Sequence, residues 1–303
     1  ANKYGGNQNL EAIEFFKHLN TVVLGRNHGT VMIAEESTAW PKVTGKAEDD
    51  GLGFSLKWNM GWMNDFLEYM KYDPYFRSHH YKELTFSMLY AYSEDFILVF
   101  SHDEVVHGKG SMLAKMPGDE WQKFANLRAY YGFMFTHPGK KLLFMGNEFG
   151  QDWEWNAEES LRWHLLQYPM YKGMQNCVRD LNLMYKGNPA LYEVDFDYRG
   201  FEWIEHSNAD DSVISYVRKG TQPGDYLIVI CNFTPVVRRD YRVGVLEKCK
   251  YQEIFNSDDV NYWGSGVKNE GFMEAQEQEW NMKPYSVQIT LPPLSTIVIK
   301  PIR

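Results

Sequence analysis

The sequence Thr30-Val31-Met32-Ile33-Ala34-Glu35-Glu36-Ser37 joins a short apolar run to two adjacent carboxylates. Runs of this kind are typical of buried strands in a parallel sheet that is covered on both faces. Because a buried strand has no internal place for a charge, we expect Glu35 to lie where the strand emerges. In α/β barrels and open sheets that edge carries the chemistry. An acid there also caps a following helix or pairs with an arginine, so this octapeptide alone leaves both interpretations open.

Two further segments repeat this construction. The apolar run 96–100 ends in Ser101-His102-Asp103-Glu104, and the run 141–146 ends in Asn147-Glu148. Parallel strands that finish in acids or amides place several titratable groups at one edge of a sheet, as a carboxylate-based active site requires. We therefore expect Glu35 and Asp103 to project from neighbouring strand ends into one shared cleft.

Helical and extended patterns alternate up to about residue 190. Asn9 is placed to cap a helix over 10–20, and Asp119 with Gln122 forms a capping-box pattern before another helix. After residue 190 the pattern changes to β-rich runs at 212–218, 226–233 and 287–300. The sequence thus predicts an α/β region with about four strands, which is half of an eight-stranded barrel or a small open sheet, and then an all-β antiparallel sandwich.

Composition and charge narrow the possible partners. The 303 residues include 40 acids and 31 bases, for a net charge of −9, which argues against nucleic acid and acidic membranes. No apolar run is long enough for a membrane span. The aromatic content of 16% is high, and aromatic rings stack on the apolar faces of sugars, although cores use the same residues. The composition therefore favours a carbohydrate ligand.

The three cysteines, Cys177, Cys231 and Cys249, are odd in number and lack the spacing of metal ligands. Such cysteines are typical of reduced thiols in a cytoplasmic protein. Because no cluster of residues indicates a metal or an organic cofactor, we expect neither. The chain begins at Ala1 without an initiator methionine, and this start suggests a fragment of a longer protein.

Cleavage of a glycosidic bond commonly uses two carboxylates, one as an acid/base and one as a nucleophile or base. Glu35 fits the proton donor, because burial beside Glu36 is the environment that suits a carboxyl group to that role. Asp103 would hold its charge opposite a developing oxocarbenium ion or bind sugar hydroxyls. His102 would donate a hydrogen bond to a sugar hydroxyl.

Several neighbouring motifs admit other interpretations. His102 and His107 are five residues apart rather than four, so they do not form a zinc-protease motif and metal ligation is disfavoured. The sequence Gly108-Lys109-Gly110-Ser111 suggests a phosphate loop only superficially, since it lacks the full glycine spacing, and we discard that interpretation. A structural role and a substrate contact both remain open for Glu148, as stacking and packing do for three tryptophans: Trp153, Trp155 and Trp163.

Four segments together resemble the bacterial glycogen (1,4-α-glucan) branching enzymes, a family of the α-amylase superfamily: 33–37, 57–63, 98–109 and 144–149. The likeness continues through three shorter segments and so covers nearly the whole chain: 154–156, 163–166 and 232–235. Its most specific part is the run from Ser101 to Lys109.

By this resemblance Glu35 matches the general acid/base, and Asp103 matches the aspartate that stabilises the transition state. His102 matches the histidine that contacts glucose in the cleavage subsite, and Trp58 and Asn59 would lie near the glucan groove. The implied reaction is a retaining double displacement that moves an α-1,4-linked segment to a glucose 6-hydroxyl. The implied partner is therefore an α-1,4-glucan, and the implied process is glycogen biosynthesis in the cytoplasm.

One family feature has no counterpart here. The nucleophilic aspartate of the family ends the fourth barrel strand in a Gly-Phe-Arg-Val-Asp-Ala type segment, which this sequence lacks. We therefore expect residues 1–189 to hold strands 5–8, the second half of a (β/α)8 TIM-type barrel, and residues 190–303 to form the C-terminal β-sandwich. The isolated chain is then predicted to be inactive.

Two other functions remain possible on this sequence. One is an α-amylase-type or trehalose-releasing glucan hydrolase, which would use the same carboxylates but pass the sugar to water. The other is a non-catalytic glucan-binding module that uses the aromatic residues alone. The sequence leaves the oligomeric state open.

Overall fold

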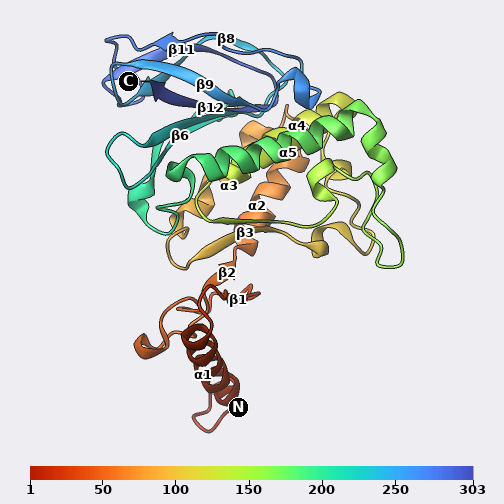
Figure 1. Cartoon of the computed structure of the whole chain (residues 1–303), viewed down its shortest axis with the longest axis vertical. Coiled ribbons are helices and arrows are strands. Elements are labelled where there is room, and N and C mark those ends of the chain that lie inside the picture. The colour runs from red at the N-terminus through yellow and green to blue at the C-terminus, as the bar shows by residue number, and fades with distance from the viewer. Residues whose placement is uncertain (303) are drawn as a thin grey trace.

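The computed structural model describes residues 1–302, in which three sheets and five α-helices occur. The first sheet is parallel, with the order β1-β2-β3-β4. Its strands are β1 (Ile33–Ala34), β2 (Leu56–Trp58), β3 (Phe96–Phe100) and β4 (Lys140–Leu143). Because all four run in the same direction, their carboxyl ends meet at one edge, and the half-barrel expected from the sequence is confirmed (Figure 1).

Helices precede, join and follow these strands: α1 (Leu10–Arg26), α2 (Met60–Lys71), α3 (Lys82–Thr85), α4 (Glu120–Thr136) and α5 (Pro169–Gly187). The helix starts follow the predicted capping chemistry. The Asn9 side chain accepts a hydrogen bond from the amide of Ala12 at 3.0 Å. Asp119 and Gln122 exchange side chain-to-backbone hydrogen bonds of 2.8 and 3.0 Å, so the predicted capping box is confirmed.

The β-rich part forms a sandwich of two antiparallel sheets. The larger sheet has the order β10-β9-β12-β7-β6-β5, and the smaller pairs β11 with β8. The strands are β5 (Phe201–Glu205), β6 (Val213–Lys219), β7 (Tyr226–Asn232), β8 (Arg238–Val245), β9 (Lys250–Asn256), β10 (Met273–Glu274), β11 (Tyr285–Leu291) and β12 (Ser295–Ile302). Buried aliphatic side chains fill the space between the sheets, among them Ile228, Val243 and Val287. The predicted sandwich is confirmed, whereas a domain boundary at 189/190 stays a prediction.

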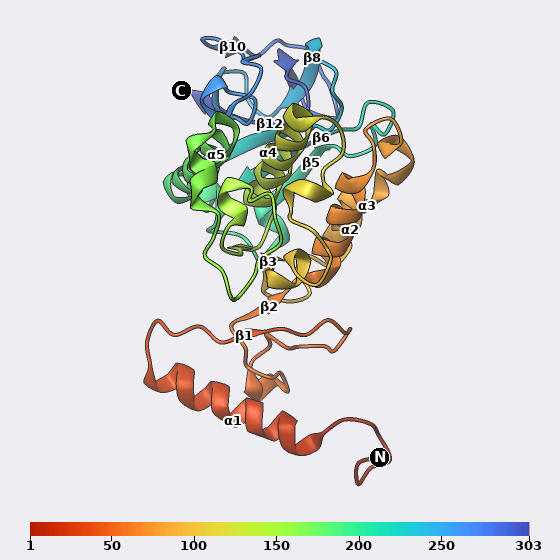
Figure 2. The ribbon, with the colours of Figure 1, turned by 90° about the vertical axis from the view of Figure 1, so that its right-hand side faces the viewer.

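The outer face of the larger sheet packs on α4 (Figure 2). Every residue of α4 from Phe124 to Thr136 is buried. Gly132 permits this close approach, because a Cβ atom there would lie 2.6 Å from the Cβ of Thr296. The Thr296 hydroxyl also donates to the carbonyl of Ala129 at 2.9 Å. The two parts of the chain therefore share one continuous apolar core.

Three buried arginines connect the helices to the β-sandwich. Each donates to a backbone carbonyl across this interface: Arg77 to Phe233 at 2.8 Å, Arg128 to Ser257 at 2.7 Å, and Arg218 to Thr136 at 2.7 Å. Burial lowers the pKa of Arg77 and Arg128 to about 10, so both stay charged at neutral pH. These contacts fix the sandwich against the parallel sheet.

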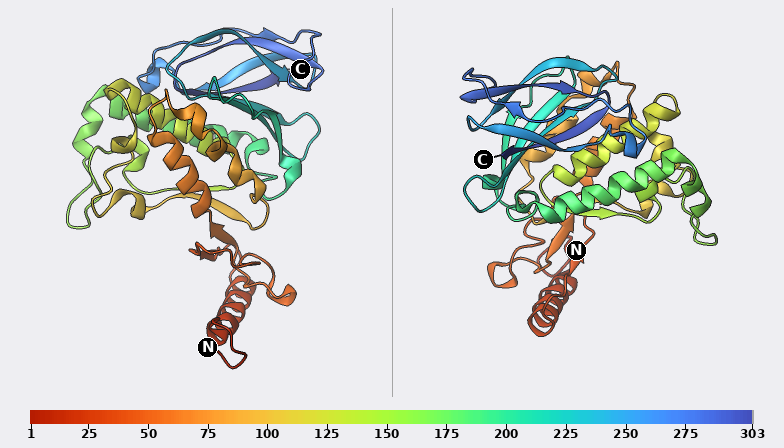
Figure 3. Two further views of the ribbon diagram at one scale, coloured as in Figure 1. Left: turned by 180° about the vertical axis from the view of Figure 1, so that it is seen from behind. Right: turned by 45° about the horizontal axis from the view of Figure 1, so that its top comes forward.

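The region around α1 and β1 lies apart from this core (Figure 3). The run 30–37 was expected to be a buried strand, and this expectation is wrong. Only two of its residues form β1, and Ile33 is 42% exposed. The reason is that, within residues 1–302, β1 is an edge strand that pairs with β2 alone, so one of its sides has no neighbouring strand.

Candidate active site

The carboxyl edge of the parallel sheet gathers the predicted site residues. Glu35 follows β1, Trp58 ends β2 and Asn59 comes next, while His102 and Asp103 follow β3. The prediction that Glu35 and Asp103 follow neighbouring strands is wrong, because β2 lies between β1 and β3. Two inter-strand spacings separate those strands by about 10 Å. The two carboxylates thus belong to the same edge but are not adjacent.

Glu35 is exposed, so the prediction that its carboxyl group is buried is wrong. Its neighbour Glu36 is engaged elsewhere. The Glu36 carboxylate accepts hydrogen bonds from the Lys57 ammonium at 3.2 Å and from the amide of Thr38 at 3.0 Å. Partial burial raises the pKa of Glu36, but the bonds from Thr38 and Lys57 outweigh it and hold that pKa below its usual range. Glu35 is therefore the member of the pair that is free to act on a ligand.

His102 and Asp103 stand at the start of a single helical turn, His102–Val105. The Ser101 hydroxyl accepts from the amide of Asp103 at 3.1 Å, and the Glu104 carboxylate accepts from the amide of Ser101. Burial raises the pKa of Glu104, whose role is to hold this turn. His102 Nε2 lies 3.3 Å from Asp103 Oδ1, and their side chains are 49% and 41% exposed. Both are thus accessible to a ligand.

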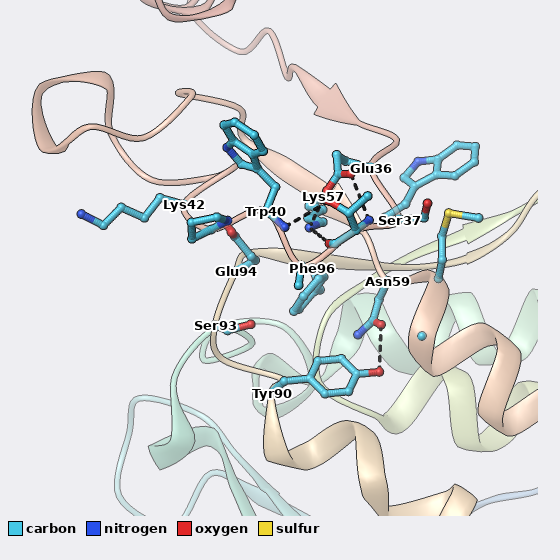
Figure 4. A pocket seen from close by; sticks show the side chains of 16 residues that line it. Glu36, Ser37, Trp40, Lys42, Lys57, Asn59, Tyr90, Ser93, Glu94 and Phe96 are labelled. Carbon is cyan, nitrogen blue, oxygen red and sulfur yellow. Dashed lines mark hydrogen bonds and ion pairs between the residues drawn. The ribbon is translucent and has the colours of Figure 1, made fainter. Parts of the chain in front are cut away.

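Trp58 and Asn59 line a pocket of about 530 Å³ beside the end of β2 (Figure 4). Asn59 also caps α2, since its side-chain oxygen accepts from the amide of Trp62 at 2.9 Å. Trp40 lines the same pocket and was not predicted, although a tryptophan so soon after a strand-end carboxylate is a recognisable signal. Glu35, His102 and Asp103 do not line this pocket, so it is separate from the two carboxylates.

Other residues left open by the sequence have defined contacts. Glu148 accepts from the amide of Gly146 at 2.7 Å, which is a structural role in the turn after β4. Trp155 packs edge-on against Phe144, with ring centroids 5.2 Å apart, while Trp153 is largely exposed.

Among residues 1–302, no helix combines the length and apolar character needed to cross a membrane. Over this range the structure also holds no cluster of three or more His, Cys, Asp or Glu side chains suited to a metal ion.

The chain is similar in sequence to known proteins. Residues 203–302 match the family described as the α-amylase C-terminal all-β domain. The chain is 54% identical over 300 residues to the 1,4-alpha-glucan branching enzyme GlgB of Rubrobacter xylanophilus, covering 99% of this chain and 41% of that protein. It is 56% identical over 301 residues to the GlgB of Halothermothrix orenii, covering 99% of this chain and 48% of that protein.

Solved structures agree with the fold. An α-amylase from H. orenii matches with a TM-score of 0.59 and 14% identity, covering 96% of this chain and 57% of that one. A cyclomaltodextrinase matches with a TM-score of 0.63 and 16% identity, covering 95% of this chain and 43% of that one. At identities this low, the similarity shows only that the fold is shared.

The chain spans less than half the length of the two branching enzymes named above. The match nevertheless runs through both the parallel sheet and the β-sandwich, since it covers 99% of this chain. The chain therefore resembles the 1,4-α-glucan branching enzymes of the α-amylase superfamily, and it matches the C-terminal portion of these proteins.

Proposed function

We propose that this chain supplies the acid/base part of an active site that branches α-1,4-glucans. The observation that carries the proposal is the position of Glu35 and Asp103 at the carboxyl edge of one parallel sheet. This observation gains weight because the chain is more than half identical to proteins named 1,4-alpha-glucan branching enzymes. Both side chains are accessible to a polymeric substrate.

In the proposed mechanism Glu35 protonates the glycosidic oxygen of the departing glucan while a nucleophile attacks the anomeric carbon. Glu35 then acts as a base and takes the proton of an acceptor 6-hydroxyl, whose oxygen displaces the nucleophile and forms an α-1,6 linkage. Asp103 stabilises the positive charge of the oxocarbenium-like transition state, and His102 donates to a sugar hydroxyl. The nucleophile would come from a segment that corresponds to the part of the branching enzymes outside the matched region.

Two further residues at the carboxyl edge of the parallel sheet, Trp58 and Asn59, are candidates for contact with the substrate. The Trp58 indole is a flat apolar ring that lines the pocket, and Asn59 has an amide nitrogen beside its capping oxygen. We propose that both lie beside the bound glucan and that the enzyme acts in the cytoplasm. The three free thiols, Cys177, Cys231 and Cys249, support that location, because unpaired cysteines are typical of reducing compartments.

The test is linkage analysis by proton NMR after incubation with amylose. The assay uses the full-length protein that the gene of this chain encodes. A branching enzyme produces new α-1,6 signals with little increase in reducing ends. A hydrolase produces reducing ends without new branches, which would overturn the proposal.

A non-catalytic module would be recognised by a third outcome. It would be retarded in gels that contain glycogen and yet change neither branches nor reducing ends. The chain 1–303 alone is predicted to give that result, because it holds no counterpart of the nucleophile. Transfer by this chain alone would contradict the proposed division of catalytic residues.

A further inference from the structure

The loop after β3 makes a tight turn at residues 107–110, and this turn is held by a carboxylate from another loop. The backbone is left-handed at His107, Gly108 and Gly110, with φ values of 59°, 81° and 73°. The Glu154 side chain accepts hydrogen bonds from the amide of Gly108 at 3.1 Å and of Gly110 at 2.6 Å. Each carboxylate oxygen takes one of these two amides.

Backbone amides that point to the same side of a turn form a concave site for an anion. Here the anion is a side chain of the protein itself, which explains why a Gly-Lys-Gly sequence at 108–110 is not a phosphate site. The hydrogen bonds from Gly110 and Gly108 lower the pKa of Glu154, so the carboxylate is charged at neutral pH. Because both oxygens are occupied by backbone donors, Glu154 is not itself placed to protonate a substrate.

Further hydrogen bonds connect the segment around Glu154 with the backbone of the candidate site. The amide of Trp155 donates to the carbonyl of Val105 at 2.9 Å, so the 154–155 segment contacts the loop at several points. Within the turn, the Lys109 ammonium donates to the backbone carbonyl of Asp103 at 2.7 Å. The position of Lys109 is in turn fixed between Gly108 and Gly110. The backbone that presents His102 and Asp103 is therefore connected to Glu154 through the turn.

A second cation supports the same turn. The Lys115 ammonium donates to the carbonyls of Lys109 and Gly110, the latter at 3.1 Å. The turn thus has its amides bound by a carboxylate and its carbonyls bound by an ammonium group. This leaves little freedom for the turn to change its conformation.

We infer that Glu154 is a positioning residue of the proposed active site, one that fixes the 107–110 turn and thereby the backbone that presents Asp103 and His102. The inference rests on the proposed function where it concerns the rate of glucan transfer. Its structural half, the hold of Glu154 on the turn, can be measured without any substrate.

Hydrogen exchange at the amides of Gly108 and Gly110 tests the structural half in the chain 1–303. Glu154→Ala removes both acceptors, so we expect exchange at these two amides to be at least about tenfold faster. Glu154→Gln keeps one oxygen acceptor, so an intermediate rate is expected. The matched control is Glu159→Ala, which removes an exposed acid from the same loop and should leave both rates unchanged.

Steady-state kinetics on amylose test the functional half, in the longest polypeptide that the coding sequence encodes. Glu154→Ala should lower kcat by about tenfold or more, because small misplacements of catalytic groups have effects of up to about a hundredfold. KM and the melting temperature should change little, and Glu154→Gln should recover part of kcat.

The outcomes distinguish a failure of this inference from a failure of the proposed function. Unchanged exchange at Gly108 and Gly110 in Glu154→Ala would overturn the inference whatever the activity. Faster exchange with unaltered kcat, or a loss of kcat that only follows a loss of folded protein, would also overturn it. A wild-type enzyme without any glucan transfer would instead overturn the proposed function, and the exchange rates would still show whether Glu154 holds the turn.

Discussion

Helices α1 and α4 have the same length of 17 residues and lie in opposite environments. Within Leu10–Arg26 the one residue that is fully buried is Asn20, whereas α4 is buried without a break from Phe124 to Thr136. Both helices start with a side-chain cap, so local sequence is enough to begin each of them. Their burial depends instead on what the rest of the chain brings against them. The comparison shows that helix formation and helix packing are separate problems.

The same contrast separates the two proposed catalytic carboxylates. Asp103 follows β3, whose five residues are all buried, and its loop is held by the Glu154 carboxylate from another loop. Glu35 follows β1, which has only two residues, and one of them is exposed. The difference between the exposed and the buried parts of the molecule can be tested by paired substitutions, one at a buried position and one at an exposed position.

The largest effect on stability is expected from Arg218→Met. Arg218 and its partner Asp195 have fully buried side chains that lie 2.7 Å apart. Removing one member of a buried pair leaves an inadequately compensated charge, so the free energy of unfolding should fall by about 3–5 kcal/mol. Urea denaturation measures it. The exposed pair of Arg199 with Asp197 supplies the control, since Arg199→Met should cause no measurable change. Equal losses in the two variants would contradict the account.

A pH effect of intermediate size is expected from His137 at the end of α4. Burial lowers the pKa of His137 from 6.5 to about 3. Between these values the unfolded chain binds a proton that the folded chain does not, so stability is lost as pH falls from 6.5 toward 3. From pH 7 to pH 5 this contribution is about 2 kcal/mol.

The measurement for His137 is the free energy of unfolding at pH 7 and pH 5, for the wild type and for His137→Gln. The difference between the two pH values should be smaller in the variant by about 2 kcal/mol. The same difference in both proteins would show that the buried imidazole does not titrate as expected.

Matched glycine substitutions sharpen the comparison of the two helices. Gly132→Ala on α4 places a methyl group against Thr296, so we expect a net loss of about 1–2 kcal/mol after the gain in helix propensity. Gly25→Ala on α1 meets no heavy atom within 4 Å and should stabilise that helix by up to about 1 kcal/mol. Thermal unfolding followed by circular dichroism measures both. Opposite signs are predicted, and a loss at Gly25 as large as at Gly132 would show that α1 is packed after all.

The smallest effect is expected on the apolar face of α1. Phe15 is 60% exposed, so Phe15→Ser should change the free energy of unfolding by no more than about 0.5 kcal/mol. Phe133→Ser on α4 is the counterpart and should cost several times more, because Phe133 is buried. A loss of more than about 2 kcal/mol at Phe15 would contradict the exposed position of this face.

Local patterns predicted the elements but not how they meet. The strand 96–100, the caps at Asn9 and Asp119, and the β-sandwich were all predicted from runs of adjacent residues, and the structure contains them. The run 30–37 also starts with apolar residues, yet Ala34 is its one buried residue, whereas all of 96–100 is buried. Burial of a strand is decided by the layers on either side of it, which a single run does not encode.

The site was predicted in part for the same reason. Strand-end carboxylates follow from the sequence, so Glu35 and Asp103 could be placed at one edge. Their order could not, because the three-residue strand β2 inserts between β1 and β3. Glu154 carries no local signal, since the amides that it binds are more than forty residues away along the chain. Contacts of this range appear only when the loops are placed in space.

The most direct measurement for the account as a whole is the rate of α-1,6 linkage formation by Glu35→Gln, in the longest polypeptide that the coding sequence encodes. Glutamine keeps the shape of the side chain but cannot donate or take the proton, so the account predicts a rate lower by about a hundredfold or more. Retardation by glycogen in gels should stay the same, and the exposed Glu48→Gln should branch amylose like the wild type. Branching by Glu35→Gln at the wild-type rate would contradict the account.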